Sequence, residues 1–468
     1  MNKTHITNIK ISNLYDRLNY DIPFPSNQPV SVLIAPNGAG KTTILNLLYY
    51  IFGCGRFEDI FNVPFDSIRI SLSNGKTVVF SRLNKSGDTS SAPIYTHRRG
   101  QGYLLDRAPS LTISETDEYA TCTSYDRFEF TCGRNFSRID FMLAIYQGKK
   151  LMGEPVVYSE MDKKCYELYG KQDEREGFSA ESEEEYERLH NASVSASFFD
   201  IWIEQDEYLR KYDCNIDIVY INTKRTLQES MKSVPLEKRV GDIRSAIEDQ
   251  IKRTSSIYFQ SITSLHSSLI SSYLQNTINT NCSYDEFRKK WDDYQDMLVR
   301  LQKFDMVPEE ELISINEDTY NAKKEFLNIY LQTFSETLGD MMDLYTRLNL
   351  LKEIIDSRNQ YTGNVLTYDQ NVGMFFTTCK NTYIPVEELS SGELHDLIMF
   401  YNLIFNDDTL LLIDEPEISE HISWQKSFLN KLIEICAVNN NQAIVTTHSP
   451  YITKGHNDLI LKANITKT

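Results

Sequence analysis

The chain has 468 residues, of which 41% are hydrophobic and 24% are charged, and its formal net charge is −18. This length allows two or three domains with sizeable cores, and the composition is ordinary for a soluble globular protein. The excess of acid argues against broad, non-specific binding of nucleic acid, because such binding uses a basic surface to neutralise phosphates.

Features of secreted, membrane and zinc proteins are not found in the sequence. The longest nearly apolar runs, such as 397–405, are interrupted by polar residues and fall short of the roughly 18 residues of a membrane span. The N-terminus leads into a polar alternation and not into an apolar signal core. The eight cysteines form no C-x-x-C pair and have no histidine at zinc spacing. We therefore expect a cytoplasmic protein with reduced thiols and no membrane segment.

Residues 1–115 predict the N-terminal part of an α/β domain. The stretch 5–24 alternates apolar and polar residues, as a half-buried strand with a following loop would. The apolar run 30–35 opens into a glycine-containing loop, and apolar residues then recur at helical spacing over 42–52. Two β-like runs, 67–72 and 76–83, flank Ser-Asn-Gly, which is a strong hairpin signal. Together they predict an antiparallel β-layer beside a strand–loop–helix unit.

The next two segments differ in character. Residues 116–213 have no clear period and contain the acidic run 173–187, so they predict an inserted subdomain with a solvated segment. Residues 214–230 contain the apolar run 216–221, which predicts a core strand returning to the first domain.

Residues 231–359 predict a helical arm. No glycine occurs from 242 to 338, and Pro308 is the only proline of that stretch. Apolar residues keep helical spacing in 284–301 and again in 326–355, which predicts two long helices paired as an antiparallel hairpin. Packing of the two helices on each other explains this apolar stripe, and the outer surface of the arm could bind a partner.

Residues 360–468 return to β-type runs and complete the first domain. They contain a serine–glycine motif at 389–393, an apolar strand at 410–414 that ends in Asp-Glu, and a second apolar strand at 443–447 followed by His448. No internal repeat is evident.

The loop before the first helix has the pattern of a phosphate loop. Backbone N–H groups of 38–41 can surround a β-phosphate, and the start of the helix adds its positive dipole end. Lys41 should reach the β- and γ-phosphates, and the Thr42 hydroxyl should ligate Mg²⁺. Ala35 stands where the usual pattern has glycine, a mild departure, and an exposed turn with a surface lysine is the plainer alternative. The predicted nucleotide-binding residues of this loop are Asn37, Gly38, Ala39, Gly40, Lys41, Thr42 and Thr43.

Two acids and a histidine follow the two later apolar strands. Asp414 should hold Mg²⁺ directly or through water, Glu415 should polarise the attacking water, and His448 can contact the γ-phosphate. Taken one at a time, acids at a strand end and a lone histidine are more often structural.

The serine–glycine motif supplies a second anion-binding end. Ser390, Ser391, Gly392 and Glu393 stand at a predicted helix start, where backbone N–H groups bind anions. The motif is weak by itself and gains meaning from its place between the phosphate loop and the Asp-Glu strand.

The four motifs, in this order, resemble those of the ABC-type ATPase superfamily and its SMC/RecF-like and OLD-like branch. The sequence 414–417, the pair Trp424-Gln425 and the run 447–450 are more similar to that branch than to transporter cassettes. Its Leu-His-Pro is Glu420-His421-Ile422 here, and two glutamines, Gln101 and Gln147, are candidates for the glutamine loop.

This resemblance implies an α/β fold, with an ABC-type ATPase head of mixed sheet and antiparallel β-layer interrupted by an inserted subdomain and a helical-hairpin arm. It also implies ATP and Mg²⁺ as cofactors. It further implies a homodimer or higher homo-oligomer in which residues 390–393 complete a neighbour's phosphate loop.

A cellular role is implied by analogy alone. OLD-family nucleases continue into a Toprim domain, which we do not find here, and no other nuclease motif is evident. The chain resembles the ATPase subunits of PARIS-type two-component anti-phage systems, which implies a separate effector, a Toprim-type nuclease, and a phage-encoded trigger as partners. The alternatives are a RecF/SMC-type ATPase for DNA repair or tethering, and a transporter's nucleotide-binding half, which the long insert disfavours.

Overall fold

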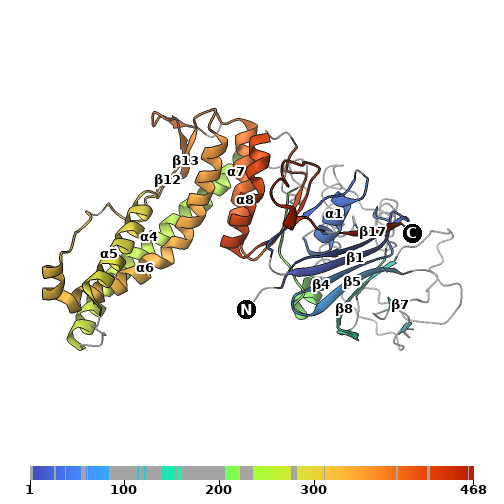
Figure 1. The fold of residues 1–468 in the computed structure, drawn as a ribbon, viewed down its shortest axis with the longest axis horizontal. Coiled ribbons are helices and arrows are strands. Elements are labelled where there is room, and N and C mark those ends of the chain that lie inside the picture. The colour runs from blue at the N-terminus through green and yellow to red at the C-terminus, as the bar shows by residue number, and fades with distance from the viewer. Residues whose placement is uncertain are drawn as a thin grey trace, which may run out of the picture. The chain divides into compact units, whose positions relative to one another are not determined.

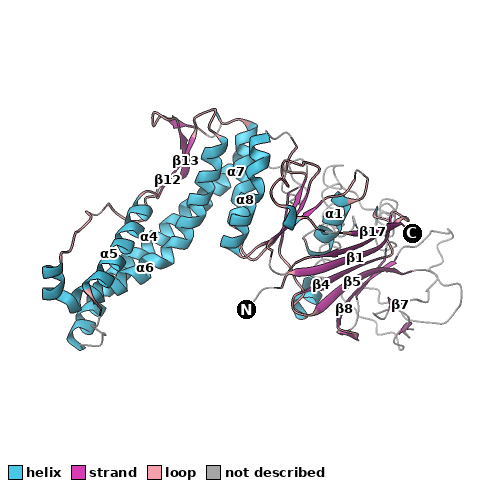
Figure 2. Ribbon diagram, in the orientation of Figure 1, coloured by secondary structure: helices cyan, strands magenta, loops and turns pink. Residues whose placement is uncertain are grey.

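The protein is described here from a computed structural model, which divides into two compact units (Figure 1). Unit 1 comprises Met1–Thr223, Asp408–Cys436 and Asn440–Thr468, and unit 2 comprises Lys224–Asp407 with Ala437–Asn439. Strands dominate the first unit and helices the second (Figure 2). The structure describes residues 4–25, 28–36, 38–53, 60, 62–83, 113–114, 121–122, 140–153, 156–159, 206–221, 236–275, 282–309, 311–385, 388–418, 422–461 and 463–467.

Unit 1 contains a four-stranded, fully parallel sheet. Its order is β11 (Ile218–Ile221), β15 (Leu410–Asp414), β16 (Gln442–Thr446) and β3 (Val30–Leu33). All residues of β3 and β15 are buried, as expected of strands in a parallel sheet that is covered on both faces. The expected return of the chain through 216–221 is confirmed, because β11 pairs with β15.

Helices follow two of these strands. α1 (Lys41–Phe52) starts after β3, as predicted, and α8 (Ile422–Asn439) lies between β15 and β16 in sequence.

A second sheet in unit 1 is antiparallel. Its path is β10 (Val156–Ser159), β8 (Asp140–Gln147), β5 (Lys76–Leu83), β4 (Ser67–Leu72), β1 (Ile6–Leu14), β2 (Leu18–Pro23) and β17 (Asn464–Lys467), with β9 (Lys150–Leu151) paired to β8. The predicted β4–β5 hairpin is confirmed. A separate pair, β6 (Ile113–Ser114) and β7 (Thr121–Cys122), completes the strands in the described part of this unit.

The expectation of one strand and a loop over 5–24 is wrong, because β1 and β2 form a hairpin there. The chain reverses at Tyr15 and Asp16, which both have left-handed backbone angles, with φ of 55° and 54°. Consecutive left-handed residues are the geometry of a tight hairpin turn. The usual Asn-Gly or Asp-Gly signal of that turn is not present at this position.

One hydrophobic core joins the two sheets of unit 1. Apolar residues of α1, such as Leu45 and Leu48, belong to the same buried cluster as Ile9 of β1 and Leu412 of β15. The helix that starts at the phosphate loop is therefore fixed from several sides.

The described residues of unit 2 form three long helices, α4 (Leu236–Gln275), α5 (Tyr284–Gln302) and α6 (Glu317–Arg358). A small sheet follows, with β12 (Val365–Asp369), β13 (Gly373–Thr377) and β14 (Tyr383–Ile384), and then α7 (Ser391–Ile404). Residues 360–407 belong to unit 2, where α7 packs on α4 and α6, and the rest of the predicted segment 360–468 lies mainly in unit 1.

The predicted antiparallel pairing of the helices at 284–301 and 326–355 is wrong. The Phe287 ring stacks on Tyr320 with centroids 4.5 Å apart, and Phe304 stacks on Tyr345 at 5.0 Å. Because the residue numbers rise together on both helices, α5 and α6 run in the same direction. The linker 303–316 returns along α5 to make this possible.

The helical hairpin of the arm is instead formed by α4 and α6. Arg244, early in α4, donates a hydrogen bond to the Val372 carbonyl beside β13. Tyr368 of β12 donates to the Leu348 carbonyl, late in α6. The start of α4 and the end of α6 therefore lie at the same small sheet. No helix in the described part of the chain is long and apolar enough to span a bilayer.

The aromatic seam between α5 and α6 should dominate the stability of the arm. Replacing Phe287, which is 1% exposed, by alanine should lower the free energy of unfolding by about 3–5 kcal/mol. Phe326→Ala is the matched control, because that ring is 44% exposed and its loss should cost less than about 1 kcal/mol. Urea unfolding followed by far-UV circular dichroism measures both, and equal losses would contradict the packing.

Candidate nucleotide-binding site

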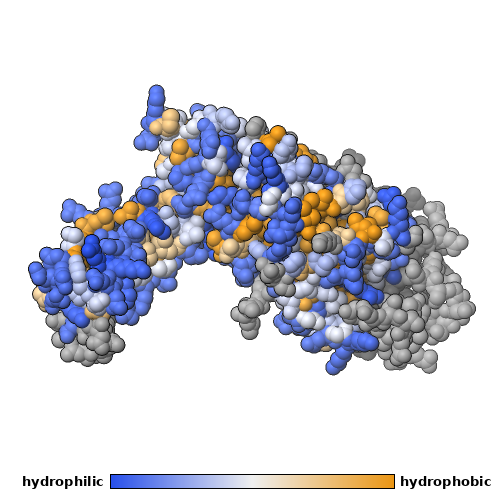
Figure 3. Space-filling view, in the orientation of Figure 1, coloured by the Kyte–Doolittle hydropathy of each residue, from blue (hydrophilic) through white to orange (hydrophobic). Residues whose placement is uncertain are grey.

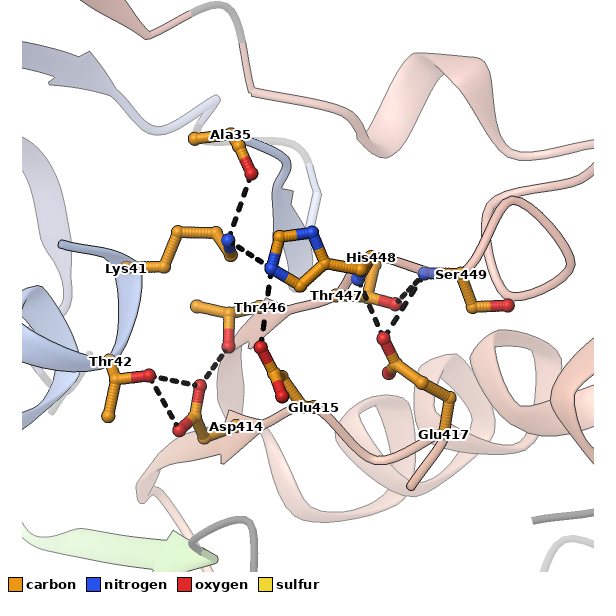
Figure 4. Close-up of polar contacts among 10 residues, drawn as sticks. All are labelled: Ala35, Lys41, Thr42, Asp414, Glu415, Glu417, Thr446, Thr447, His448 and Ser449. Atoms are coloured by element: carbon orange, nitrogen blue, oxygen red, sulfur yellow. Dashed lines mark hydrogen bonds and ion pairs between the residues drawn. The ribbon is translucent and has the colours of Figure 1, made fainter. Parts of the chain in front are cut away.

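The parallel sheet determines where the predicted site residues meet. β3, β16 and β15 are neighbours, so their carboxyl ends lie at one edge of the sheet. In doubly wound parallel sheets, ligands bind outside this edge. The phosphate loop follows β3, Asp414 and Glu415 follow β15, and His448 follows β16, and Figure 4 shows their side chains directed toward one another.

The phosphate loop requires glycine at two positions. Gly38 and Gly40 have φ of 76° and 82°, in the left-handed region that favours glycine. A Cβ at Gly40 would also lie 3.0 Å from Cδ2 of Leu14. Gly40 is the N-cap of α1 and supplies no side-chain cap, so the first turn can direct its N–H groups at an anion. Asn37 lies outside the described residues.

Lys41 is directed into this edge. Its side chain is buried, and Nζ donates to the Ala35 carbonyl at 2.9 Å and lies 2.5 Å from Nε2 of His448. Burial lowers the pKa of Lys41 below its ordinary value, although the carboxylates of Glu415, Asp414 and Glu417 oppose the shift. A desolvated ammonium so placed is a strong ligand for phosphate oxygens.

Asp414 and Thr42 form an oxygen-donor pair suited to Mg²⁺. Asp414 is 2% exposed, and its Oδ2 accepts a hydrogen bond from Thr42 Oγ1 at 2.9 Å. The Thr446 hydroxyl also donates to Asp414 and fixes the orientation of its carboxylate. Within the described ranges, no group of three or more His, Cys, Asp or Glu residues could hold a metal. Two protein oxygens completed by phosphate and water match the preference of Mg²⁺.

Glu415 and His448 form the outer part of the cluster. Glu415 has a left-handed φ of 48°, and its N–H donates to the Thr446 carbonyl at 2.9 Å. Its Oε1 lies 3.3 Å from His448 Nε2, and the two side chains are 25% and 36% exposed. Both groups can therefore reach a water molecule or a terminal phosphate at this edge.

The serine–glycine motif is at the start of α7 in unit 2. Ser390 is the N-cap and forms a capping box with Glu393. Asn364 and Thr362 donate to Glu393 Oε1 at 2.8 and 3.2 Å. Burial raises the pKa of Glu393, but the hydrogen bonds from Ser390, Asn364 and Thr362 bring it below its ordinary value. The structure thus brings Lys41–Thr43, Asp414, Glu415 and His448 together in unit 1, and it describes Ser390–Glu393 in unit 2 only.

Several contacts at the phosphate loop were not predicted. Tyr15 OH lies 2.6 Å from Thr43 Oγ1, Arg17 donates to the Gly38 carbonyl at 3.4 Å, and the Tyr20 hydroxyl donates to the Ala39 carbonyl. All three residues come from the β1–β2 hairpin, which was not expected from the sequence. The aromatic and basic residues around its turn were the available signal.

The remaining motif residues have separate positions. Gln425 of α8 is buried and accepts a hydrogen bond from the Ser449 hydroxyl at 2.5 Å. Gln147 ends β8 in the antiparallel sheet and is exposed. Gln101, Glu420 and His421 lie outside the described residues.

Comparison with known proteins gives one family match. The family model described as "AAA ATPase domain" matches residues 5–453. No curated protein matches the chain.

Solved structures with similarity to the chain include three Smc head domains. One, from Pyrococcus furiosus, has an extended coiled coil bound to the C-terminal domain of ScpA; it shares 11% identity and has a TM-score of 0.34, with 99% of this chain and 96% of that chain covered. A second, bound to the C-winged helix domain of ScpA, shares 11% identity with a TM-score of 0.32 and coverage of 99% and 98%. A third, from Pyrococcus yayanosii with a coiled coil and joint, shares 12% identity with a TM-score of 0.33 and coverage of 98% and 97%.

Proposed function

Because its match to the family model spans residues 5–453, this chain belongs to the AAA ATPase domain family, and we propose that it binds Mg²⁺·ATP and hydrolyses it slowly. The observation that carries the proposal is the meeting of Lys41, Thr42, Asp414, Glu415 and His448 at one edge of the parallel sheet.

Each residue has a distinct role in this proposal. Lys41 and the N–H groups of the loop bind the β- and γ-phosphates. Thr42 and Asp414 would hold Mg²⁺, which neutralises phosphate charge when it is bound. Glu415 accepts a proton from the attacking water, and His448 contacts the γ-phosphate.

Substitutions should separate binding from hydrolysis. Lys41→Ala should abolish ATP binding because the buried ammonium is lost. Glu415→Gln should keep binding and lower hydrolysis by about 100-fold or more, because the amide accepts no proton. Chelation of Mg²⁺ should also stop turnover. Phosphate release and a fluorescent ATP analogue measure the two steps, and Glu434→Gln on α8 is the control for removal of an acid. A Glu415→Gln protein with unchanged turnover would contradict the assignment.

We further propose that the nucleotide site is shared between chains of a homodimer or higher homo-oligomer. Ser390–Glu393 of one chain would complete the phosphate loop of its neighbour. The motif suits this role, because Ser391 and Gly392 are exposed at the start of α7 and the capping box holds that helix start rigid.

Mixing two inactive variants tests the shared site. Lys41→Ala damages the phosphate loop and Ser391→Arg damages the serine–glycine motif, so a mixed dimer keeps one intact site of two. Random mixing should restore about one quarter of the original rate, since about half of the dimers are mixed. Full ATPase activity from a strict monomer would contradict the shared site.

At the cellular level, we propose a cytoplasmic sensor and scaffold that controls a separate effector nuclease in bacterial anti-phage defence. The OLD-like sequence 414–417 and the net charge of −18 support a protein partner over a coat on DNA. The arm offers a surface for such a partner, because Leu312 and Ile313 are 58% and 61% exposed on the α5–α6 linker. A phage protein that binds one state of the assembly better would act as the trigger.

A genetic experiment tests this role. Cells that express the chain together with its adjacent gene should resist phage, and cells with either gene alone should not. Protection by this chain alone, or no protection with any neighbour, would contradict the two-component proposal. The alternative, a RecF/SMC-type DNA-repair or tethering ATPase, is favoured by the long helical hairpin of α4 and α6 and would appear as ATP-dependent DNA binding.

A further inference from the structure

The carboxylate of Glu417 binds the backbone of a neighbouring loop at the candidate site. Oε1 of Glu417, in the loop after β15, accepts hydrogen bonds from the backbone N–H of His448 at 2.6 Å and of Ser449 at 3.1 Å, in the loop after β16 (Figure 4). A carboxylate that accepts from backbone N–H groups makes hydrogen bonds about twice as strong as neutral ones.

This contact begins where backbone pairing ends. The last hydrogen bond between the two strand ends runs from the Glu415 N–H to the Thr446 carbonyl at 2.9 Å. The left-handed backbone of Glu415 then turns the chain, and the Ile418 N–H donates to the Glu415 carbonyl at 3.2 Å. The turn directs the Glu417 side chain toward the loop after β16. Its carboxylate therefore bonds to that loop beyond the point where backbone pairing of the two strands ends.

The imidazole of His448 depends on this connection for its direction. Its Nε2 lies 2.5 Å from Lys41 Nζ and 3.3 Å from Glu415 Oε1, so one ring nitrogen faces the phosphate-binding cation and the water-polarising acid. The ring is 36% exposed and lacks the tight packing that would fix a buried side chain. The peptide units of residues 448 and 449 therefore set where the ring points.

We propose that Glu417 is a positioning residue, which holds the backbone of His448 and Ser449 so that the imidazole stays between Lys41 and Glu415. The inference rests on the proposed ATPase function and assigns the second glutamate of the Asp-Glu-Pro-Glu sequence a role different from the first. In this proposal Glu415 meets the water, whereas Glu417 supports turnover by holding His448.

A role of Glu417 through its negative charge is the competing explanation, because its carboxylate also acts electrostatically on Lys41. The two explanations differ in the atoms they need. Positioning needs one acceptor oxygen at Oε1, which glutamine also provides. Among the described residues, Oε2 is buried and has no hydrogen-bond partner, so its replacement by an amide nitrogen breaks no contact.

The experiment compares Glu417→Ala with Glu417→Gln in the full chain. Loss of the acceptor in Glu417→Ala should lower kcat about 10- to 100-fold with KM for ATP changed less than about twofold, because only the alignment of His448 is lost. Glu417→Gln should restore kcat to within about threefold of the unaltered chain. In a His448→Ala background, Glu417→Ala should add less than about a twofold loss.

A second readout needs no turnover. The Cε1–H resonance of His448, identified by its absence in His448→Ala among the eight histidines, should move in nucleotide-free Glu417→Ala and stay in place in Glu417→Gln. Glu434→Ala, which removes an exposed acid of α8, should leave the resonance and kcat unchanged.

The outcomes separate this inference from the proposed function. An unaltered chain without ATP turnover would overturn the ATPase, and the resonance would still test the contact. An active chain in which Glu417→Gln is as impaired as Glu417→Ala, or in which Glu417→Ala costs the same without His448, would overturn positioning and leave the ATPase intact.

Discussion

Backbone pairing of β16 with β3 on one side and β15 on the other brings the N-terminal strand β3, which begins at Val30, beside two strands from the last 60 residues of the chain, for example Val30 opposite Ala443. The carboxyl ends of these strands meet at one edge. Asp414, Glu415 and His448 lie within two residues of that edge, and Lys41 is brought to it by the phosphate loop that follows β3. The phosphate loop and the Asp-Glu pair can form the candidate nucleotide-binding site only together. The chain returns to this sheet once more before β15, through β11, which pairs with β15.

The cluster also concentrates charge where the protein excludes water. Asp414 and Lys41 are 2% and 6% exposed, and buried charges are costly unless partners surround them. Glu415 adds a left-handed backbone that a residue with a Cβ rarely adopts. The core that packs α1 between the sheets stabilises the unit enough to tolerate these features. Such local departures from the best packing are typical of a functional site.

The elements that could be predicted from the sequence are those with a local sequence signal. The phosphate loop, α1, the β4–β5 hairpin and the strands ending at Asp414 and Thr446 follow from glycine positions and short apolar runs, and the structure agrees within one or two residues. The β1–β2 hairpin was missed because its turn uses Tyr15 and Asp16 without glycine. Periodicity predicted which faces of α5 and α6 are buried, but a buried stripe does not encode the direction of its partner. The contact of Glu417 with His448 spans 31 residues and leaves no local pattern.

The linker between α5 and α6 is attached at both ends of α5, so the length of the linker depends on the length of α5. Gln302 donates to the Pro308 carbonyl at one end of α5, and Tyr284 donates to the Ile315 carbonyl at the other. Eighteen helical residues advance about 27 Å, slightly more than the roughly 25 Å that seven residue steps from 308 to 315 reach when fully extended, so the side chains of Gln302 and Tyr284 supply the remaining reach. The linker is therefore nearly taut. An insertion into α5 that keeps both hydrogen bonds must be matched by an addition to the linker, about one residue for every two in the helix, so these two segments can lengthen during evolution only together.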